Sequence, residues 1–218
     1  MTLWTLLQST DSLFPTGAFS HSGGLEGLAG EGGLGTADGA EQAIEEILRC
    51  SVARVDLPGC GLAHRASGDA DRLVEIDRAL DVLKIPRELR EASRSLGRRR
   101  LRVVPALEDY RRRVEEGSSP GHQVVVTGMH LAIAGVPREE AMLAFLYGTA
   151  AGMVSAAMKL LPLGQTRAQG FLTRMGEAAP EWVRVADALA LEDLGSFTPA
   201  LDIAAMRHEV AAPRLFIS

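Results

Sequence analysis

Residues 141 to 158 read Ala-Met-Leu-Ala-Phe-Leu-Tyr-Gly-Thr-Ala-Ala-Gly-Met-Val-Ser-Ala-Ala-Met and contain no charged side chain. A helix of this length is almost long enough to cross a membrane. Ten of these eighteen residues are Ala, Gly, Ser or Thr, however, so the run is only weakly apolar. The composition therefore favours a central helix buried in an all-α protein over a membrane anchor.

Small residues recur every four positions inside this run, at Ala144, Gly148, Gly152 and Ala156. Residues four apart form a ridge along one side of a helix. Small side chains on such a ridge allow a second helix to approach closely. We therefore predict that the ridge faces a neighbouring helix at short range.

Helical periodicity extends over most of the chain. Asp38 followed by Glu41 resembles a capping box that opens a helix through Ile44, Ile47 and Leu48. Apolar residues recur at intervals of three and four from Leu73 to Leu83, and Thr198-Pro199 places an N-cap residue before a proline at the first helical position. The prolines that we expect to punctuate the helices are Pro58, Pro86, Pro105, Pro120, Pro137, Pro162 and Pro180.

Strand patterns are scarce. Only Val124 to Val126 reads as a strand, and residues 123 to 134 can equally form a buried helix. A chain of 218 residues suits one domain with a sizeable core. We therefore expect an all-α, single-domain helical bundle over residues 1 to 218. Pro213 cannot continue a helix, so residues 211 to 218 are expected to form an extended C-terminal tail.

The net charge of −5 conceals an uneven distribution. Residues 87 to 113 hold ten arginines and four acidic residues, a net charge of +6 that leaves −11 for the rest of the chain. Only Tyr110 stands among the arginines, so the stacking platforms of a nucleic-acid surface are missing. An acidic protein surface and a merely solvated helix face are the remaining interpretations, and no nucleic-acid partner is predicted.

The cysteine content and the N-terminal residues indicate a cytoplasmic protein. Cys50 and Cys60 are too few for a disulfide framework. The short apolar stretch from Leu3 to Leu7 has no basic residues before it and is followed by Asp11, unlike a signal peptide. Reduced thiols are therefore expected.

No catalytic constellation is predicted. Residues 30 to 35 satisfy G-x-G-x-x-G, but no strand precedes them, so a glycine-rich linker is the better interpretation. Cys60 and His64 have the spacing of two metal ligands on one helix face, yet a tetrahedral site needs a third and fourth. A core cysteine beside a surface histidine is favoured, and the sequence predicts no cofactor and no dedicated metal site.

The segment from Ser12 to Glu26 has the composition of an exposed functional surface. Pro15-Thr16-Gly17 is expected to form a turn, and Phe19 and His21 stand among small residues that leave them accessible. The pattern Pro-x-Gly-x-aromatic-x-His-Ser-x-Gly-Leu-Glu resembles the N-terminal signature of the urease accessory protein UreF family.

Further blocks resemble the same family in the same order. They are residues 159 to 169 with Pro-Leu-Gly-Gln, residues 206 to 218 at the C-terminus and, more weakly, residues 90 to 97. Pro213 stands where the family usually has a serine before Arg-Leu-Phe. Residues 36 to 85 match in helical pattern rather than in motif.

This resemblance implies an assembly factor that is not an enzyme. Such a protein bridges UreD, also called UreH, and the GTPase UreG on the urease apoenzyme and supports nickel delivery, as a homodimer without a membrane. Alternatives are a generic helical interaction module and a helical metal-dependent hydrolase that uses Cys60 and His64. The tail, with its apolar Leu215, Phe216 and Ile217, is expected to become ordered on a partner, UreD. Predicted partner contacts are Phe19, His21, Glu26, Lys159, Arg167, His208, Glu209, Arg214, Leu215 and Phe216.

Overall fold

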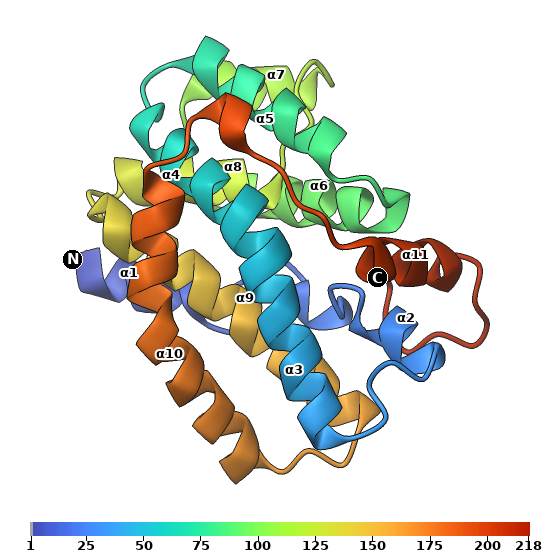
Figure 1. Ribbon diagram of the computed structural model, residues 1–218. Coiled ribbons are helices and arrows are strands. Elements are labelled where there is room, and N and C mark those ends of the chain that lie inside the picture. Colours follow the sequence, from blue (N-terminus) through green and yellow to red (C-terminus); the bar gives the residue numbers. More distant parts are fainter. Residues whose placement is uncertain (1) are drawn as a thin grey trace.

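The computed structural model describes residues 2–218, and every regular element among them is helical (Figure 1). The α-helices are α1 (Thr2–Thr10), α2 (Leu25–Gly30), α3 (Ala37–Ile47), α4 (Leu57–Arg65), α5 (Ala70–Leu83), α6 (Arg87–Leu101), α7 (Glu108–Glu115), α8 (Gln123–Ile133), α9 (Arg138–Leu160), α10 (Gln165–Asp187) and α11 (Pro199–His208). Short 3-10 turns are η1 (Ala18–Ser20) and η3 (Leu191–Asp193), and η2 (Leu48–Asp56) is a π-helical segment. The all-α class predicted from the sequence is confirmed.

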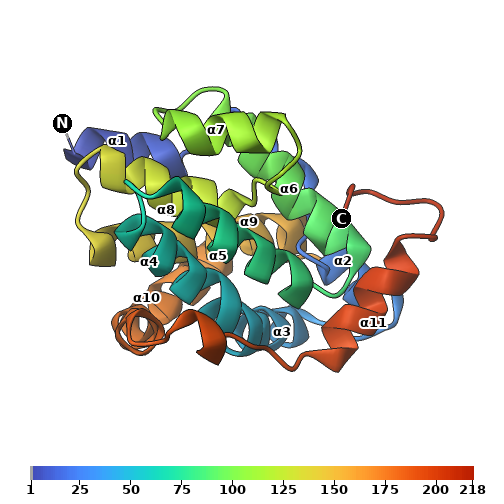
Figure 2. The same cartoon turned by 90° about the horizontal axis from the view of Figure 1, so that it is seen from above.

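The helices surround two large apolar cores, and Leu131, Val136 and Ala141 form a third, smaller cluster. One core gathers α3, α9 and α10, together with Leu25 of α2 and Phe216 of the tail. The other gathers α4, α5, α7 and α8. Figure 1 shows α3, η2 and α4 following one another as a single long rod, which therefore joins both cores. Figure 2 shows α11 and the C-terminal end on the side of the molecule away from α1.

Most helix assignments from the sequence are confirmed. Helix α5 covers the periodic residues from Leu73 to Leu83, and α11 begins at Pro199 with Thr198 in the N-cap position. Residues 124 to 126 lie in α8 and are buried, so the helical alternative to a strand is correct. Ile44, Ile47 and Leu48 lie in continuous helical backbone and are buried in the core.

The predicted capping box at Asp38 was wrong. Helix α3 begins one residue before it, and Thr36 is the N-cap, with its hydroxyl accepting the amide of Gly39 at 3.1 Å. The sequence offers two N-cap residues close together, and the extended backbone at Thr36 selects the earlier one. Asp38 and Glu41 instead bind Arg167 at the start of α10.

Two prolines lie within continuous helical backbone rather than between helices. Pro58 follows the π-helical segment and has no amide hydrogen to donate to the carbonyl of Arg54, four residues earlier. That carbonyl instead accepts the amide of Gly195 at 3.4 Å. Pro180 lies inside α10. Both halves of that helix bury apolar side chains, including Phe171 and Val183, and this packing offsets the lost backbone bond.

The middle of the predicted ridge on α9 does not pack against another helix. Ala144 and Ala156 are buried, but a side chain at Gly148 or Gly152 would meet nothing within 4 Å. The neighbours of α9 contact its larger apolar side chains instead, such as Leu146. Within residues 2–218, α9 is the one helix long and apolar enough to suit a membrane span, and half of that stretch is buried in the fold.

Close helix approach occurs at other glycines. A Cβ at Gly128 of α8 would overlap the backbone oxygen of Cys60 in α4. A Cβ at Gly97 of α6 would overlap the backbone oxygen of Gly121, just before α8. These two positions allow α4 and α6 to pack tightly against α8, a contact that the sequence analysis did not predict.

A buried carboxylate links the helices around the second core. Asp77 of α5 is fully buried and accepts hydrogen bonds from the Tyr110 hydroxyl at 3.0 Å and the Ser119 hydroxyl at 2.6 Å. It also accepts the backbone amides of Gly121 at 2.6 Å and His122 at 2.9 Å. Four donors satisfy the charge, so the carboxylate ties α7 and the loop before α8 to α5.

Candidate partner-binding surface

The C-terminal tail docks on the segment that follows the N-terminal signature turn. The amide of Ile217 donates to the carbonyl of Ser20 at 2.9 Å, and the hydroxyl of Ser22 donates to the carbonyl of Ser218 at 2.8 Å. Phe216 and Ser218 are buried, whereas Ile217 stays exposed. Residues far apart in the chain therefore form one surface beside α2 (Figure 1).

Glu26 holds the tail from the first turn of α2. Its carboxylate accepts the amide of Leu215 at 2.6 Å and the amide of Phe216 at 2.8 Å. Burial alone would raise the pKa of Glu26, but these two amides and the imidazole of His208 outweigh it and hold the pKa below its ordinary value. The ionised carboxylate is thus the form that binds the tail.

His208 of α11 lies between two carboxylates. Its Nε2 is 2.9 Å from Glu26, and its Nδ1 is 2.9 Å from Glu88 in the first turn of α6. The two ring nitrogens thus face carboxylates from two different helices. The buried His208 therefore joins α2, α6 and α11, and Arg214 of the tail adds a longer contact to Glu88 at 3.4 Å.

Lys159 joins the end of α9 to the same surface. Its ammonium lies 3.1 Å from the centroid of the Phe19 ring and 5.0 Å from that of Phe216. Both distances suit a cation–π interaction. Partial burial lowers the pKa of Lys159. Phe19 remains 66 % exposed, so one face of its ring is free for contact.

His21 connects the signature to the tail's last residue. Its Nδ1 lies 2.6 Å from the hydroxyl of Ser218, while its buried Nε2 has no partner among residues 2–218. Burial and the charge of Arg99 lower the pKa of His21, which favours the neutral ring. Gly17 has a φ of +77°, as expected for a glycine in the predicted turn, and Arg99 occupies the place of a Cβ there.

We call Phe19, Lys159, Arg214, Leu215 and Ile217 the docked-tail surface, because these exposed side chains surround the docked tail. His21, Glu26, His208 and Phe216 lie beneath it and hold the tail in place.

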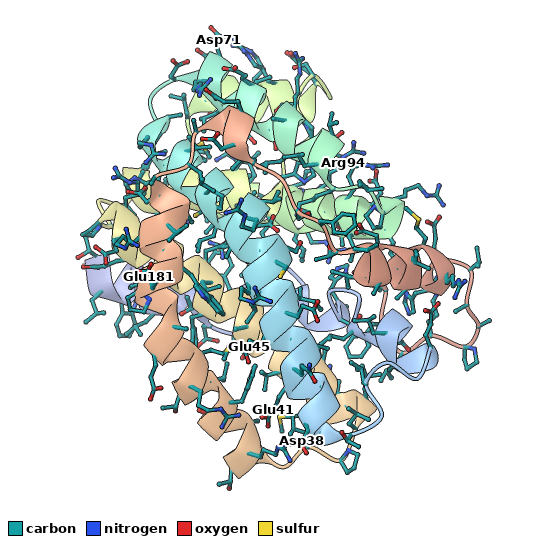
Figure 3. The ribbon with its side chains drawn as sticks, in the orientation of Figure 1. Asp38, Glu41, Glu45, Asp71, Arg94 and Glu181 are labelled. Atoms are coloured by element: carbon teal, nitrogen blue, oxygen red, sulfur yellow. The ribbon has the colours of Figure 1, made fainter. Side chains whose placement is uncertain are left out.

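Two predicted partner contacts belong neither to the docked-tail surface nor to the residues beneath it. Glu209 sits beside the docked-tail surface and forms an ion pair with Arg87. Arg167 lies apart from it, where it binds Asp38 and Glu41 at the beginning of α3, the end labelled in Figure 3. Of the predicted contacts, Arg167 alone is thus separated from the others by the fold.

The tail is ordered on its own domain, which differs from the expectation that it becomes ordered on a partner. Phe216 is 5% exposed and packs into the first core. Leu215 and Ile217 remain 62 % and 58 % exposed. Only these two of the three apolar side chains are left for a partner.

Some residues of this site were not among the contacts predicted from the sequence. Glu88 reads as an ordinary first-turn acid of α6, and Ser20, Ser22 and Ser218 lie inside the resembling blocks but were not predicted as contacts. Their roles depend on which segments the fold brings together. Only the position of Glu88 in the arginine-rich stretch set it apart.

The two candidate metal ligands do not form a pair. Cys60 is fully buried, and burial raises its pKa to about 12, which disfavours the thiolate that binds metals. Nε2 of the half-buried His64 is 2.8 Å from the carbonyl of Val136. In the part of the chain that the structure describes, no three His, Cys, Asp or Glu side chains gather as a metal site.

The fold and the site define an all-α protein whose distant sequence blocks converge on one surface. The sequence model of the UreF family matches residues 34–176. Urease accessory protein UreF of Paenarthrobacter aurescens is 35% identical over 98% of this chain and 96% of its own length. The corresponding protein of Bacillus sp. (strain TB-90) is 32% identical over 99% of both chains. The chain belongs to the UreF family.

Proposed function

We propose that the protein is a urease assembly factor that bridges UreD and the GTPase UreG on the urease apoenzyme. In this role it supports delivery of nickel, which is cargo rather than a resident cofactor. It works in the cytoplasm as a homodimer and catalyses no step itself. Membership of the UreF family, with full-length similarity to proteins named urease accessory protein UreF, carries the proposal.

The convergence of distant sequence blocks supports a contact role. The docked-tail surface combines an aromatic ring at Phe19, two exposed aliphatic side chains at Leu215 and Ile217, and cations at Lys159 and Arg214. Aromatic and arginine side chains are the residue types that contribute most to protein interfaces. The buried polar contacts beneath fix this set in place before binding, which lowers the ordering cost of association.

Co-purification tests the proposal. The variant Leu215→Ser/Ile217→Ser removes two exposed apolar side chains and leaves the tail's hydrogen bonds intact. A matched control, Val82→Ser/Ile85→Ser, removes similar side chains that are 79 % and 60 % exposed near the end of α5. We expect the tail variant to lose UreD or UreG from the complex and to activate urease poorly, while the control behaves as the parent protein does.

Two results would count against the proposal. If the parent protein failed to co-purify with UreD and UreG, the bridging role would be wrong. If both variants assembled equally well, the docked-tail surface would not be the contact.

A further inference from the structure

A hollow of about 620 Å³ lies where η2, α10 and the segment after η3 meet. Its lining includes Arg49 and Arg54 of η2, Trp182 of α10 and Phe197 of the segment that leads to α11. In Figure 1 this segment crosses the rod of α3, η2 and α4, and the amide of Gly195 fixes it to the carbonyl of Arg54. Because η2 is π-helical, the hollow is built on a type of segment that occurs frequently at functional sites.

Aromatic side chains give the hollow an apolar lining. Trp182 is half-buried and packs against the first core. Phe197 is 86% exposed, so residues 2–218 leave most of its ring uncovered, and Val185 of α10 is 39% exposed beside it. Aromatic and arginine side chains are enriched in the contact surfaces of proteins. The lining therefore has the composition of a protein contact site.

The two arginines of the hollow have no acidic partner. Arg49 and Arg54 are exposed, no carboxylate lines the hollow, and neither guanidinium forms an ion pair within residues 2–218. Asp56, two residues after Arg54, binds Lys84 at 2.6 Å instead. The exposed Glu46, three residues before Arg49, does not pair with either arginine. Two positive charges thus stand beside an apolar surface without compensation from the described chain.

A second hollow, between α5 and α7, shows the contrast. Its lining combines acids and arginines, among them Asp71, Glu116 and Arg113. Arg113 binds Asp71 at 2.6 Å, so charges of both signs are paired within that hollow. An excess of positive charge is therefore specific to the hollow at η2 in this comparison.

We propose that the hollow at η2 is a docking site for an acidic segment of a partner protein. An apolar side chain of the segment packs on Trp182 and Phe197, and neighbouring carboxylates pair with Arg49 and Arg54. Charge complementarity selects this occupant, because the hollow offers two unpaired cations and no acid. Arginine can bind a carboxylate through two parallel hydrogen bonds, which favours this anion further.

The site is separate from the docked-tail surface. None of the residues that line it belongs to that surface or to the residues beneath it. The proposal therefore does not depend on the proposed function, and a peptide can test it without any urease component.

A synthetic peptide tests this site on the full-length protein. The probe is a fluorescein-labelled peptide of about twelve residues, or three helical turns, with Leu and Phe on one face and Asp and Glu between them. Fluorescence anisotropy at about 0.15 M salt measures its affinity, so that weak long-range attraction is screened. We expect a Kd below about 1 mM, and at least tenfold weaker binding of a peptide with Asn and Gln in place of the acids.

Charge-matched variants locate the binding. Arg49→Glu/Arg54→Glu is expected to weaken binding at least tenfold. Arg98→Glu/Arg102→Glu on α6 makes the same change in net charge at two other exposed arginines and is expected to have little effect. Thermal unfolding should show that both variants keep the stability of the parent protein, because all four side chains are exposed.

An apolar pair of variants tests the aromatic contact. Phe197→Ser removes a side chain that is 86% exposed, so the fold should not change, and binding should weaken at least tenfold. Leu13→Ser removes one that is 88% exposed in the loop after α1 and should bind as the parent does. The chain has two tryptophans, so Trp4→Phe leaves Trp182 alone. In that variant an unlabelled peptide should shift the emission maximum of Trp182 to shorter wavelength, because the segment removes water from the indole.

Five outcomes would overturn the proposal. They are the absence of peptide binding, equal binding of the amide peptide, an equal loss in the α6 control, an unchanged Trp182 emission in the complex, and a homodimer in sedimentation that Phe197→Ser dissociates. Binding of fluorescent ATP that is lost in Arg49→Glu/Arg54→Glu, without peptide binding, would likewise show that the occupant is a nucleotide and that the partner class is wrong.

Discussion

Nε2 of His208 lies 2.9 Å from the carboxylate of Glu26, although 182 residues separate the two in the sequence. Through this contact α11 packs on α2, and the same carboxylate binds the tail amides of Leu215 and Phe216. One acidic side chain thus couples the beginning of the chain to its end.

Replacing Glu26 with Gln should loosen the tail. The amide side chain cannot accept both tail amides and the imidazole as an ionised carboxylate does, and the loss should be about 1–3 kcal/mol. Hydrogen exchange at the amides of Leu215 and Phe216 measures it. Glu31→Gln is the control, because Glu31 pairs with the exposed Arg207 and such pairs contribute little. Unchanged exchange in the Glu26 variant would show that the tail docks without this carboxylate.

Replacing Asp77 with Ala should destabilise the whole fold. Four donors would lose their common acceptor in a fully buried place, at a cost of about 3–5 kcal/mol. Thermal unfolding checks this. Asp71→Ala on the same helix removes only a surface pair with Arg113, at the exposed edge labelled in Figure 3, and should leave the melting temperature nearly unchanged. Equal effects of the two variants would contradict the buried-carboxylate argument.

Glycine substitutions should separate tight from open helix contacts. Gly128→Ala and Gly97→Ala place a Cβ against backbone oxygens, which cannot move away easily, and should cost about 1–3 kcal/mol or more. Gly152→Ala on α9 meets open space and should stabilise the protein by up to about 1 kcal/mol through helix propensity. Denaturant unfolding ranks the three variants. A loss of stability in the Gly152→Ala variant would contradict the open space at this position and would indicate that the ridge on α9 is packed.

The stability of the protein should fall between pH 6.5 and 4 in part because of His130. Its pKa is lowered from 6.5 to about 4 in the fold, so the unfolded chain binds a proton in this range that the folded chain does not. This contribution is fully present above pH 6.5 and decreases by up to about 3 kcal/mol as the pH falls through 4. Urea unfolding of the parent and of His130→Asn should show a steeper pH dependence in the parent. Parallel curves would contradict a buried neutral His130.

The sequence alone determined which segments are helical, because that information is local. The spacing of apolar residues from Leu73 to Leu83 and the Thr198-Pro199 start are read within one or two turns. The resembling blocks also predicted most residues that the fold gathers around the tail. Local patterns failed where two signals competed, as at Thr36 and Asp38, or where packing overrode a propensity, as at Pro180.

Only the tertiary structure decided which surfaces these helices share. The prediction that residues 144 to 156 are helical was correct, but the prediction that Gly148 and Gly152 face a neighbouring helix was wrong. The spacing of small residues does not specify which neighbours cover α9. The same holds for Glu26, whose acidic side chain is common at a helix start. Its pairing with His208 and the tail depends on where α11 packs, and Arg100 is left without an acid for the same reason. Burial and charge pairing are properties of the packed chain, and the order of residues does not reveal them.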